Sequence, residues 1–147
     1  MIRQLSVALL ALPVLTGAGS AAEPSPYAGW QERTIKALSP QQVEDYLEGR
    51  GMAMALPAEL NGYPGPRHVL ELAEELDLTS EQRARTERLF EEMRRNAIAL
   101  GEQIVAREAA LDELFASGIA TGAELRAAAE GLGLLTAGCA PITSATI

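Results

Sequence analysis

Few side chains in this 147-residue chain have the types and spacing that a metal-binding or catalytic site requires. His68 and Glu71 stand three positions apart in a segment of helical pattern, so an imidazole and a carboxylate can share one face. Such a pair can bind zinc, and the thioethers of Met52 and Met54 suit copper. A specific site needs three or four converging ligands, however, and the neighbour one turn beyond His68 is Leu72. We therefore expect no metal or other cofactor, and keep zinc or copper at His68 as an alternative that needs a further ligand-bearing helix or a second copy.

Enzymatic constellations are absent from the sequence. There is one His and one Cys, and no Gly-x-Ser-x-Gly, Walker, dinucleotide-binding or His-Glu-x-x-His pattern. Glu71, Glu74 and Glu75 lie close together, but a solvated helix face explains three such carboxylates without paired catalysis. We expect the protein not to be an enzyme, and we assign no catalytic residue.

The first 22 residues have the features of a cleaved secretory signal. Arg3 precedes an apolar run over residues 5–14, and Ser20-x-Ala22 suits signal peptidase, with cleavage after Ala22. The apolar run is too short for a stable membrane span, so we expect no stable membrane insertion after cleavage. A retained N-terminal anchor is the alternative.

The acidic composition limits the choice of partners. The net charge is −8, and the predicted cleavage removes one Arg and no acid. Non-specific nucleic-acid binding needs Lys and Arg to neutralise phosphates, so we expect no nucleic-acid partner. The single Cys139 cannot form an intramolecular disulfide. A small domain without disulfides or metal must bury its own apolar surface or share it with a second copy.

Three segments share the pattern Ser/Thr-x-x-Glu/Gln, which is typical of a helix N-terminus. They are residues 39–42, 79–82 and 121–124. In such a capping box the hydroxyl accepts a hydrogen bond from the third helical amide, and the Glu or Gln side chain binds the amide of the cap residue. Pro40 strengthens the first case, because its missing N–H would have been unpaired there. The sequence therefore predicts helices that begin near residues 40, 80 and 122.

The second of these helices is the longest, from Ser80 to about residue 117, where Ser117 and Gly118 end it. One apolar seam follows alternating steps of three and four residues, interrupted only by Arg107: Phe90, Met93, Ala97, Leu100, Ile104, Leu111 and Leu114. Gly101 weakens the middle of the helix and allows a bend or a close approach by another element. The fold class is thus all-α, with an extended helical hairpin or bundle.

The segments before the long helix are shorter. We expect an N-terminal arm over residues 23–65, irregular up to residue 37, with a helix at 40–48 and a helical turn or two at 52–60. A helix that begins at Pro66 then carries an apolar face: Val69, Leu72, Ala73 and Leu76. Acids crowd its other face, and the long helix has a basic start that holds Arg83, Arg85, Arg88, Arg94 and Arg95. We expect these arginines to pair with the acidic helix; the alternative is that they steer acidic clients.

Leu78, Thr79 and Gln82 complete a Leu-Thr-x-x-Gln motif that follows a secretory signal and opens a long helix. In this the chain resembles the Spy/CpxP family of periplasmic proteins, which includes ATP-independent chaperones and related heavy-metal sensors. The resemblance covers roughly residues 38–130. It implies a periplasmic location and a helical-hairpin domain over residues 66–130 that forms a homodimer. It also implies binding of unfolded or misfolded envelope proteins; the alternative is a heavy-metal sensor or metal-binding protein.

A second stripe on the long helix is the candidate client-binding surface. A chaperone that works without nucleotide must offer apolar patches rimmed by charge. The stripe alternates with charged residues, including Arg94 and Arg95, and its apolar members are Leu89, Ile98, Val105 and Phe115. The competing interpretation places most of these four in the protomer core or a dimer seam.

The C-terminal residues 131–147 depart from the family pattern, because they carry no charged side chain. Gly131 and Gly133 are expected to break the last helix, and no helical stripe follows them. Two interpretations stay open: a genuine, disordered tail with Cys139 as an exposed thiol, or a reading frame that shifts near residue 130.

Overall fold

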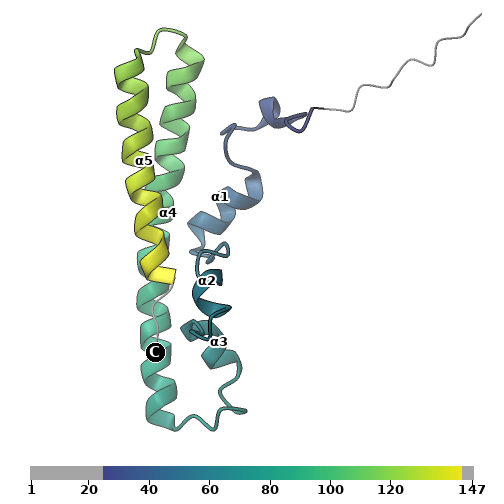
Figure 1. The fold of residues 1–147 in the computed structure, drawn as a ribbon, viewed down its shortest axis with the longest axis vertical. Helices are drawn as coiled ribbons and strands as arrows, with labels where there is room; N and C mark the ends of the chain where they lie inside the picture. Colours follow the sequence, from purple (N-terminus) through teal and green to yellow (C-terminus); the bar gives the residue numbers. More distant parts are fainter. Residues whose placement is uncertain (1–24, 144–147) are drawn as a thin grey trace, which may run out of the picture.

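The computed structural model describes the backbone of residues 25–143 and the side chains of residues 25–139. Within this range the protein is all-α, as predicted, and contains no strand. The elements are the 3-10 turn η1 (Trp30–Glu32) and the helices α1 (Pro40–Leu47), α2 (Leu56–Glu59), α3 (Pro66–Glu71), α4 (Ser80–Ser117) and α5 (Gly122–Thr143). Figure 1 shows α4 as a spine, with α5 antiparallel on one side and the segment α1–α3 on the other. The predicted signal, residues 1–22, lies outside the described residues.

All three predicted capping boxes are formed. Each satisfies two amides at a helix start, where backbone donors have no helical partner. The reciprocal bonds are 2.8 to 3.3 Å long and join Ser39 to Gln42, Thr79 to Gln82 and Thr121 to Glu124. The Thr121 amide and hydroxyl lower the pKa of the Glu124 carboxyl. Local chemistry therefore sets where α1, α4 and α5 begin.

α4 has the predicted bounds and length. Its 38 residues span about 57 Å at the usual helical rise. Gly118, at φ 67°, ends it and donates its N–H to the Phe115 carbonyl at 3.3 Å. Ile104 is only 1% exposed, Arg107 is exposed, and the rest of the predicted seam is half-buried. The seam therefore faces the elements that flank α4.

The prediction that Gly131 and Gly133 break the last helix is wrong. α5 continues through both glycines to Thr143 and packs along the second half of α4 (Figure 1). A glycine in a helix costs only about 1 kcal/mol, which burial against α4 can offset. Cys139 is 5% exposed, so it is not the exposed thiol expected, and burial raises its pKa. The described part of the tail is thus helical rather than disordered. The frameshift hypothesis stays a prediction.

α1 crosses α4 where Gly101 allows the two backbones to touch. A Cβ atom on Gly101 would lie 2.7 Å from the carbonyl carbon of Tyr46 and closer still to its oxygen. Gly49, at φ 67° just after α1, meets α4 in the same way, since its Cβ would lie 3.0 Å from the Arg94 carbonyl oxygen. The close approach that the sequence suggested at Gly101 is therefore confirmed, and it seats α1 on the middle of α4.

The helix expected from Pro66 to Leu76 is shorter than predicted, and its predicted apolar face is mostly not buried. α3 ends at Glu71, and turns follow up to Asp77, whose φ is 49°. Ala73 is buried, but Leu72 is 49% and Leu76 52% exposed. Acidic side chains near a helix C-terminus oppose the helix dipole, which explains why this acidic segment leaves the helical path early.

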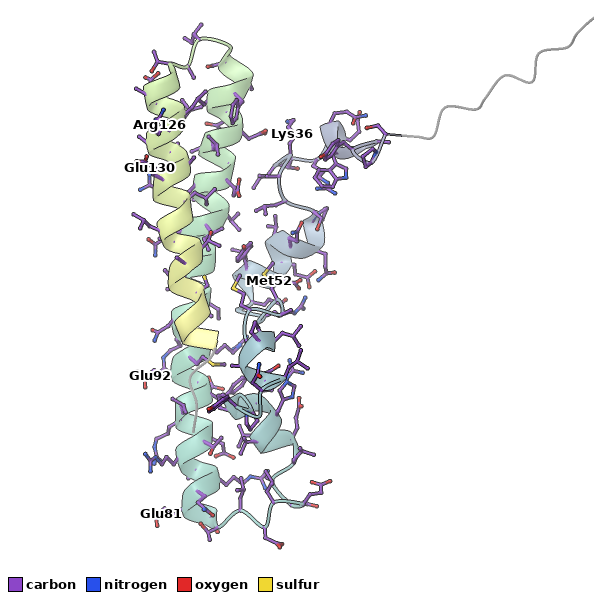
Figure 2. The ribbon with its side chains drawn as sticks, viewed as in Figure 1. Lys36, Met52, Glu81, Glu92, Arg126 and Glu130 are labelled. Carbon is purple, nitrogen blue, oxygen red and sulfur yellow. The ribbon has the colours of Figure 1, made fainter. Side chains whose placement is uncertain are left out.

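The segment before α1 is irregular apart from η1, as predicted, but three side chains anchor it. Ile35 and Leu38 are buried, and the Lys36 ammonium reaches Asp112 in the second half of α4 at 3.1 Å (Figure 2). Farther out, the Arg33 guanidinium stacks over the Trp30 ring at 3.9 Å. The N-terminal segment therefore starts beside the second half of α4 and runs toward the N-terminal end of α4.

Candidate functional site

A groove lies where the segment after α3 meets the first turns of α4. Its volume is about 590 Å³. We call it the cap groove; its lining residues are Val69, Leu78, Gln82, Arg85, Thr86, Arg88, Leu89 and Glu92. Two of them, Leu78 and Gln82, belong to the Leu-Thr-x-x-Gln motif. The motif therefore builds a surface as well as a helix start.

The capping box fixes the geometry of this groove. Gln82 holds the Thr79 amide at 2.9 Å, and the Leu78 amide next to it donates to the Ala73 carbonyl at 3.0 Å. Thr86 is 3% exposed and donates its hydroxyl to the Gln82 carbonyl at 3.0 Å. These bonds hold Leu78 on one wall of the groove. α4 carries the opposite wall.

Charge surrounds the apolar part of the cap groove. Leu78, Val69 and Leu89 supply the apolar side chains, and all three are half-buried. Arg85 and Arg88 are exposed and make no ion pair within the described residues. A half-covered apolar patch with unpaired cations beside it can hold an apolar segment that carries acidic residues.

The expected pairing between the acidic segment 66–77 and the basic start of α4 is wrong. Arg83 pairs instead with Glu87 on α4 itself, at 3.3 Å. Glu71 is bound by Arg67, which lowers the pKa of its carboxyl, with a smaller contribution from His68. Residues within one turn of each other satisfy these charges first, because they are held close by the helix. The other arginines in the basic start of α4 make no ion pair within the described residues.

The predicted client-binding residues do not form one continuous surface. Leu89 lines the cap groove, and Ile98 packs on Gly49 after α1. Val105 is half-buried in the second half of α4, and Phe115 is 62% exposed near the hairpin turn. About 39 Å of helix separates Leu89 from Phe115. Arg94 and Arg95 are exposed between them.

Sequence reasoning missed part of the groove wall. Val69 was assigned only to the apolar face of a helix, and Thr86 was not singled out. The available signal was the position of Thr86 four residues after Gln82, where a hydroxyl can bond back to the helix carbonyl. The fold of the segment between α3 and α4, which brings Val69 to α4, has no comparable local signature.

The metal candidate His68 has a partner that the sequence did not indicate. Its Nδ1 lies 3.0 Å from Glu71, as the spacing suggested, and its Nε2 lies 3.4 Å from Glu59 near the end of α2. Met52 lines a cleft together with His68, whereas Met54 does not. Across the described chain, no group of three or more His, Cys, Asp or Glu side chains converges as metal ligands do.

The chain matches no family model, no curated protein and no solved structure. The resemblance to the Spy/CpxP family therefore stays a prediction that depends on the residues themselves. Among the helices of residues 25–143, none combines the length and hydrophobicity of a transmembrane span.

Proposed function

We propose that the protein is a periplasmic, ATP-independent chaperone that binds unfolded or misfolded envelope proteins and acts as a homodimer. The cap groove is its principal client-binding site. The Leu-Thr-x-x-Gln motif positions that groove at the start of α4, and the exposed Phe115 near the other end of α4 extends the surface available to a long client.

The observation that carries the proposal is the combination of apolar walls and unpaired arginines in the cap groove. Leu78 and Leu89 provide walls that an unfolded chain can cover, and Arg85 and Arg88 favour clients with acidic residues. An open groove binds such segments weakly, because each apolar contact buries only part of a side chain. Weak binding lets a client leave and fold without ATP.

Aggregation of a reduced or urea-diluted client tests the proposal. The processed protein should slow aggregation, measured by light scattering, at ratios up to one dimer per client and without nucleotide. Leu89→Ser should lose at least half of this protection, because it removes an apolar wall of the groove. Leu134→Ser is the matched control, since Leu134 is exposed on α5 far from the groove. No protection by the wild type, or equal protection by both variants, would reject the proposal.

A metal-responsive role is the second candidate, and it is favoured by one observation. His68 lies between the carboxylates of Glu59 and Glu71, so a rearrangement of these side chains could offer mixed nitrogen and oxygen ligands. Zinc or copper should then raise the melting temperature of the wild type but not of His68→Ala. Equal metal response of the two proteins would exclude this role for His68.

A further inference from the structure

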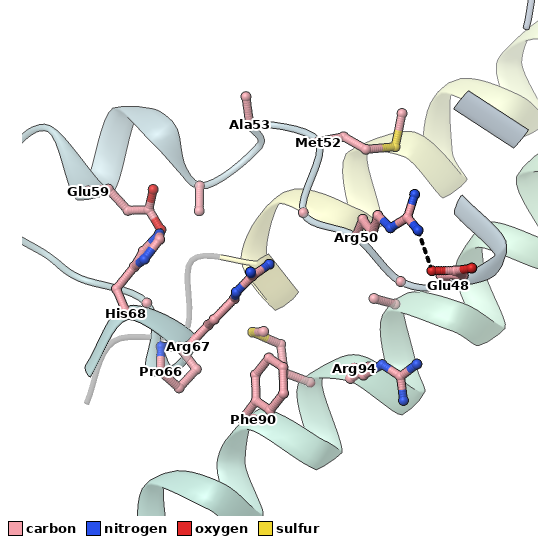
Figure 3. Close-up of a pocket in the computed structure, with 16 residues that line it drawn as sticks. Glu48, Arg50, Met52, Ala53, Glu59, Pro66, Arg67, His68, Phe90 and Arg94 are labelled. Carbon is pink, nitrogen blue, oxygen red and sulfur yellow. Dashed lines mark hydrogen bonds and ion pairs between the residues drawn. The ribbon is translucent and has the colours of Figure 1, made fainter. Parts of the chain in front are cut away.

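A second hollow, separate from the cap groove, lies between the loop after α1 and the start of α3 on one side and α4 on the other (Figure 3). Its volume is about 300 Å³. It shares no lining residue with the cap groove. Phe90, Met93 and Ala97 of α4 form its floor, and Met52 of the loop also lines it. We call it the arginine cleft because three of its lining residues are Arg50, Arg67 and Arg94.

Two of these arginines have binding capacity left. Arg67 extends across the cleft near Phe90 (Figure 3), and only its Nε is bound, by Glu71 at 2.8 Å. Its two terminal nitrogens have no protein partner among the described residues. Arg94 lies at the other end of the cleft and makes no ion pair in the same part of the chain. An unpaired guanidinium beside an apolar floor favours a carboxylate or a similar planar anion.

The other charged side chains of the cleft already have partners within the protein. Arg50 donates to three carboxylates at 2.6 to 3.1 Å, which are those of Glu44, Asp45 and Glu48. Glu59 is held by His68 at 3.4 Å, on the side of the cleft away from Arg94 (Figure 3). The donors left for an anion that enters are therefore the terminal nitrogens of Arg67, and Arg94 adds a positive charge at the other end of the cleft.

The wall opposite α4 is conformationally unusual. Met52 and Ala53 are consecutive and have φ of 46° and 60°, a left-handed conformation that is uncommon for residues other than glycine. Both line the cleft. Backbone strain of this kind concentrates at ligand-binding and switch segments, where the surrounding structure holds it in place. The loop geometry therefore supports the assignment of the cleft as a binding site.

We propose that the arginine cleft binds a small anionic amphiphile, a carboxylate on a linear alkyl chain. The apolar floor takes the chain, and the terminal nitrogens of Arg67 take the head group. A volume of about 300 Å³ is enough for a short amphiphile such as octanoate, whose non-hydrogen atoms each need roughly 30 Å³. Neither a bare anion nor a neutral hydrocarbon uses both halves of this lining.

Calorimetric titration of the full processed protein with octanoate tests the proposal. Octanoate should bind one site per chain with a Kd of about 1 mM or tighter. Octanamide, which has the same shape and no charge, should bind at least ten times more weakly. Acetate, which lacks the alkyl chain, should not show saturable binding.

Two matched variants locate the site. Arg67→Met should weaken octanoate binding at least fivefold, and the substitution spares the fold because the Arg67 side chain is 68% exposed. Arg95→Met is the control, because Arg95 neighbours Arg94 in sequence but does not line the cleft. Equal affinity for octanamide, equal losses in the two variants, or no saturable binding of octanoate would overturn the proposal. If the wild type does not bind octanoate and Arg67→Met nevertheless loses client protection, the cleft belongs to the client-binding surface.

Discussion

At the scale of single residues, Gly101 decides how α1 meets α4. The absent side chain lets the Tyr46 carbonyl lie directly on the helix backbone, in a place where any Cβ atom would overlap it. The sequence shows a glycine inside an apolar seam, which indicates a close approach or a bend. It does not show which element approaches, because that depends on the path of the whole N-terminal segment.

Gly101→Ala should destabilise the protein. The added methyl group meets backbone atoms, which cannot rotate away, so α1 must shift and lose contacts with α4. Overpacking of this kind costs about 1–3 kcal/mol, more than the helix propensity that alanine contributes. Urea unfolding measures the change. Gly133→Ala is the control, since open space surrounds Gly133 and alanine should stabilise α5 by about 0.5–1 kcal/mol. Equal effects of the two substitutions would contradict the close contact.

Glu108, Tyr46 and Cys139 bring three titratable groups from α4, α1 and α5 near one another. Burial raises the pKa of Glu108 above its usual 4.5. Burial also raises the pKa of Tyr46, with smaller contributions from the charges of Cys139 and Glu108. Relative to the unfolded chain, the folded state therefore shifts Glu108 toward its protonated form.

The sign of the pH dependence follows from this shift. The folded protein holds the Glu108 proton more tightly than the unfolded chain, so stability falls as the pH rises from about 4.5 through the raised pKa. Glu108→Gln should thus raise the melting temperature slightly at pH 7 and leave it unchanged near pH 4. Glu102→Gln, at an exposed position of the same helix, is the control. A gain from Glu108→Gln that is equal at both pH values would refute the assignment.

At the scale of elements, the helix starts could be predicted and the helix ends could not in every case. A capping box needs only four consecutive residues, so its pattern is visible in the sequence. The C-terminal end of α3 depends on competition between weak helix formation and the turns that lead to Thr79. The continuation of α5 through Gly131 depends on packing against α4, which outweighs local propensity.

Thr79→Ala should lower the stability of α4 and of the cap groove together. Loss of the side-chain acceptor leaves the Gln82 amide without its partner and costs about 1 kcal/mol, or about 4 °C in melting temperature. Circular dichroism during heating measures this. Thr136→Ala, in the exposed middle of α5, should stay within about 0.5 kcal/mol of the wild type. Indistinguishable melting of the Thr79 variant and the wild type would remove the role assigned to the cap.

At the scale of the whole molecule, the protein is a thin layer of helices around one spine. α1, α3 and α5 each pack on α4, which is the element they share. Ile104 and Pro66 are the largest fully buried side chains there, and Ile119 at the hairpin turn is 86% exposed. Such an arrangement leaves apolar surface that a client or a second copy can cover. The all-α class followed from composition and periodicity, whereas the cap groove needed the three-dimensional path between α3 and α4.

The proposed homodimer predicts concentration-dependent stability. Association buries apolar surface only in the folded state, so the melting temperature should rise as protein concentration increases a hundredfold. Sedimentation velocity over the same range should show a transition from monomer to dimer. A constant melting temperature together with a monomer at every concentration would contradict the dimer.

The most direct test of the chaperone proposal is a photo-crosslink to an unfolded client. A photoreactive amino acid at position 88 lies in the cap groove, and one at position 130 projects from α5 far from it (Figure 2). The proposal predicts adducts from position 88 with the reduced, unfolded client and few with the native client. Position 130 should give few adducts with either form. Equal or stronger crosslinking at position 130, or none at position 88, would contradict client binding in the groove.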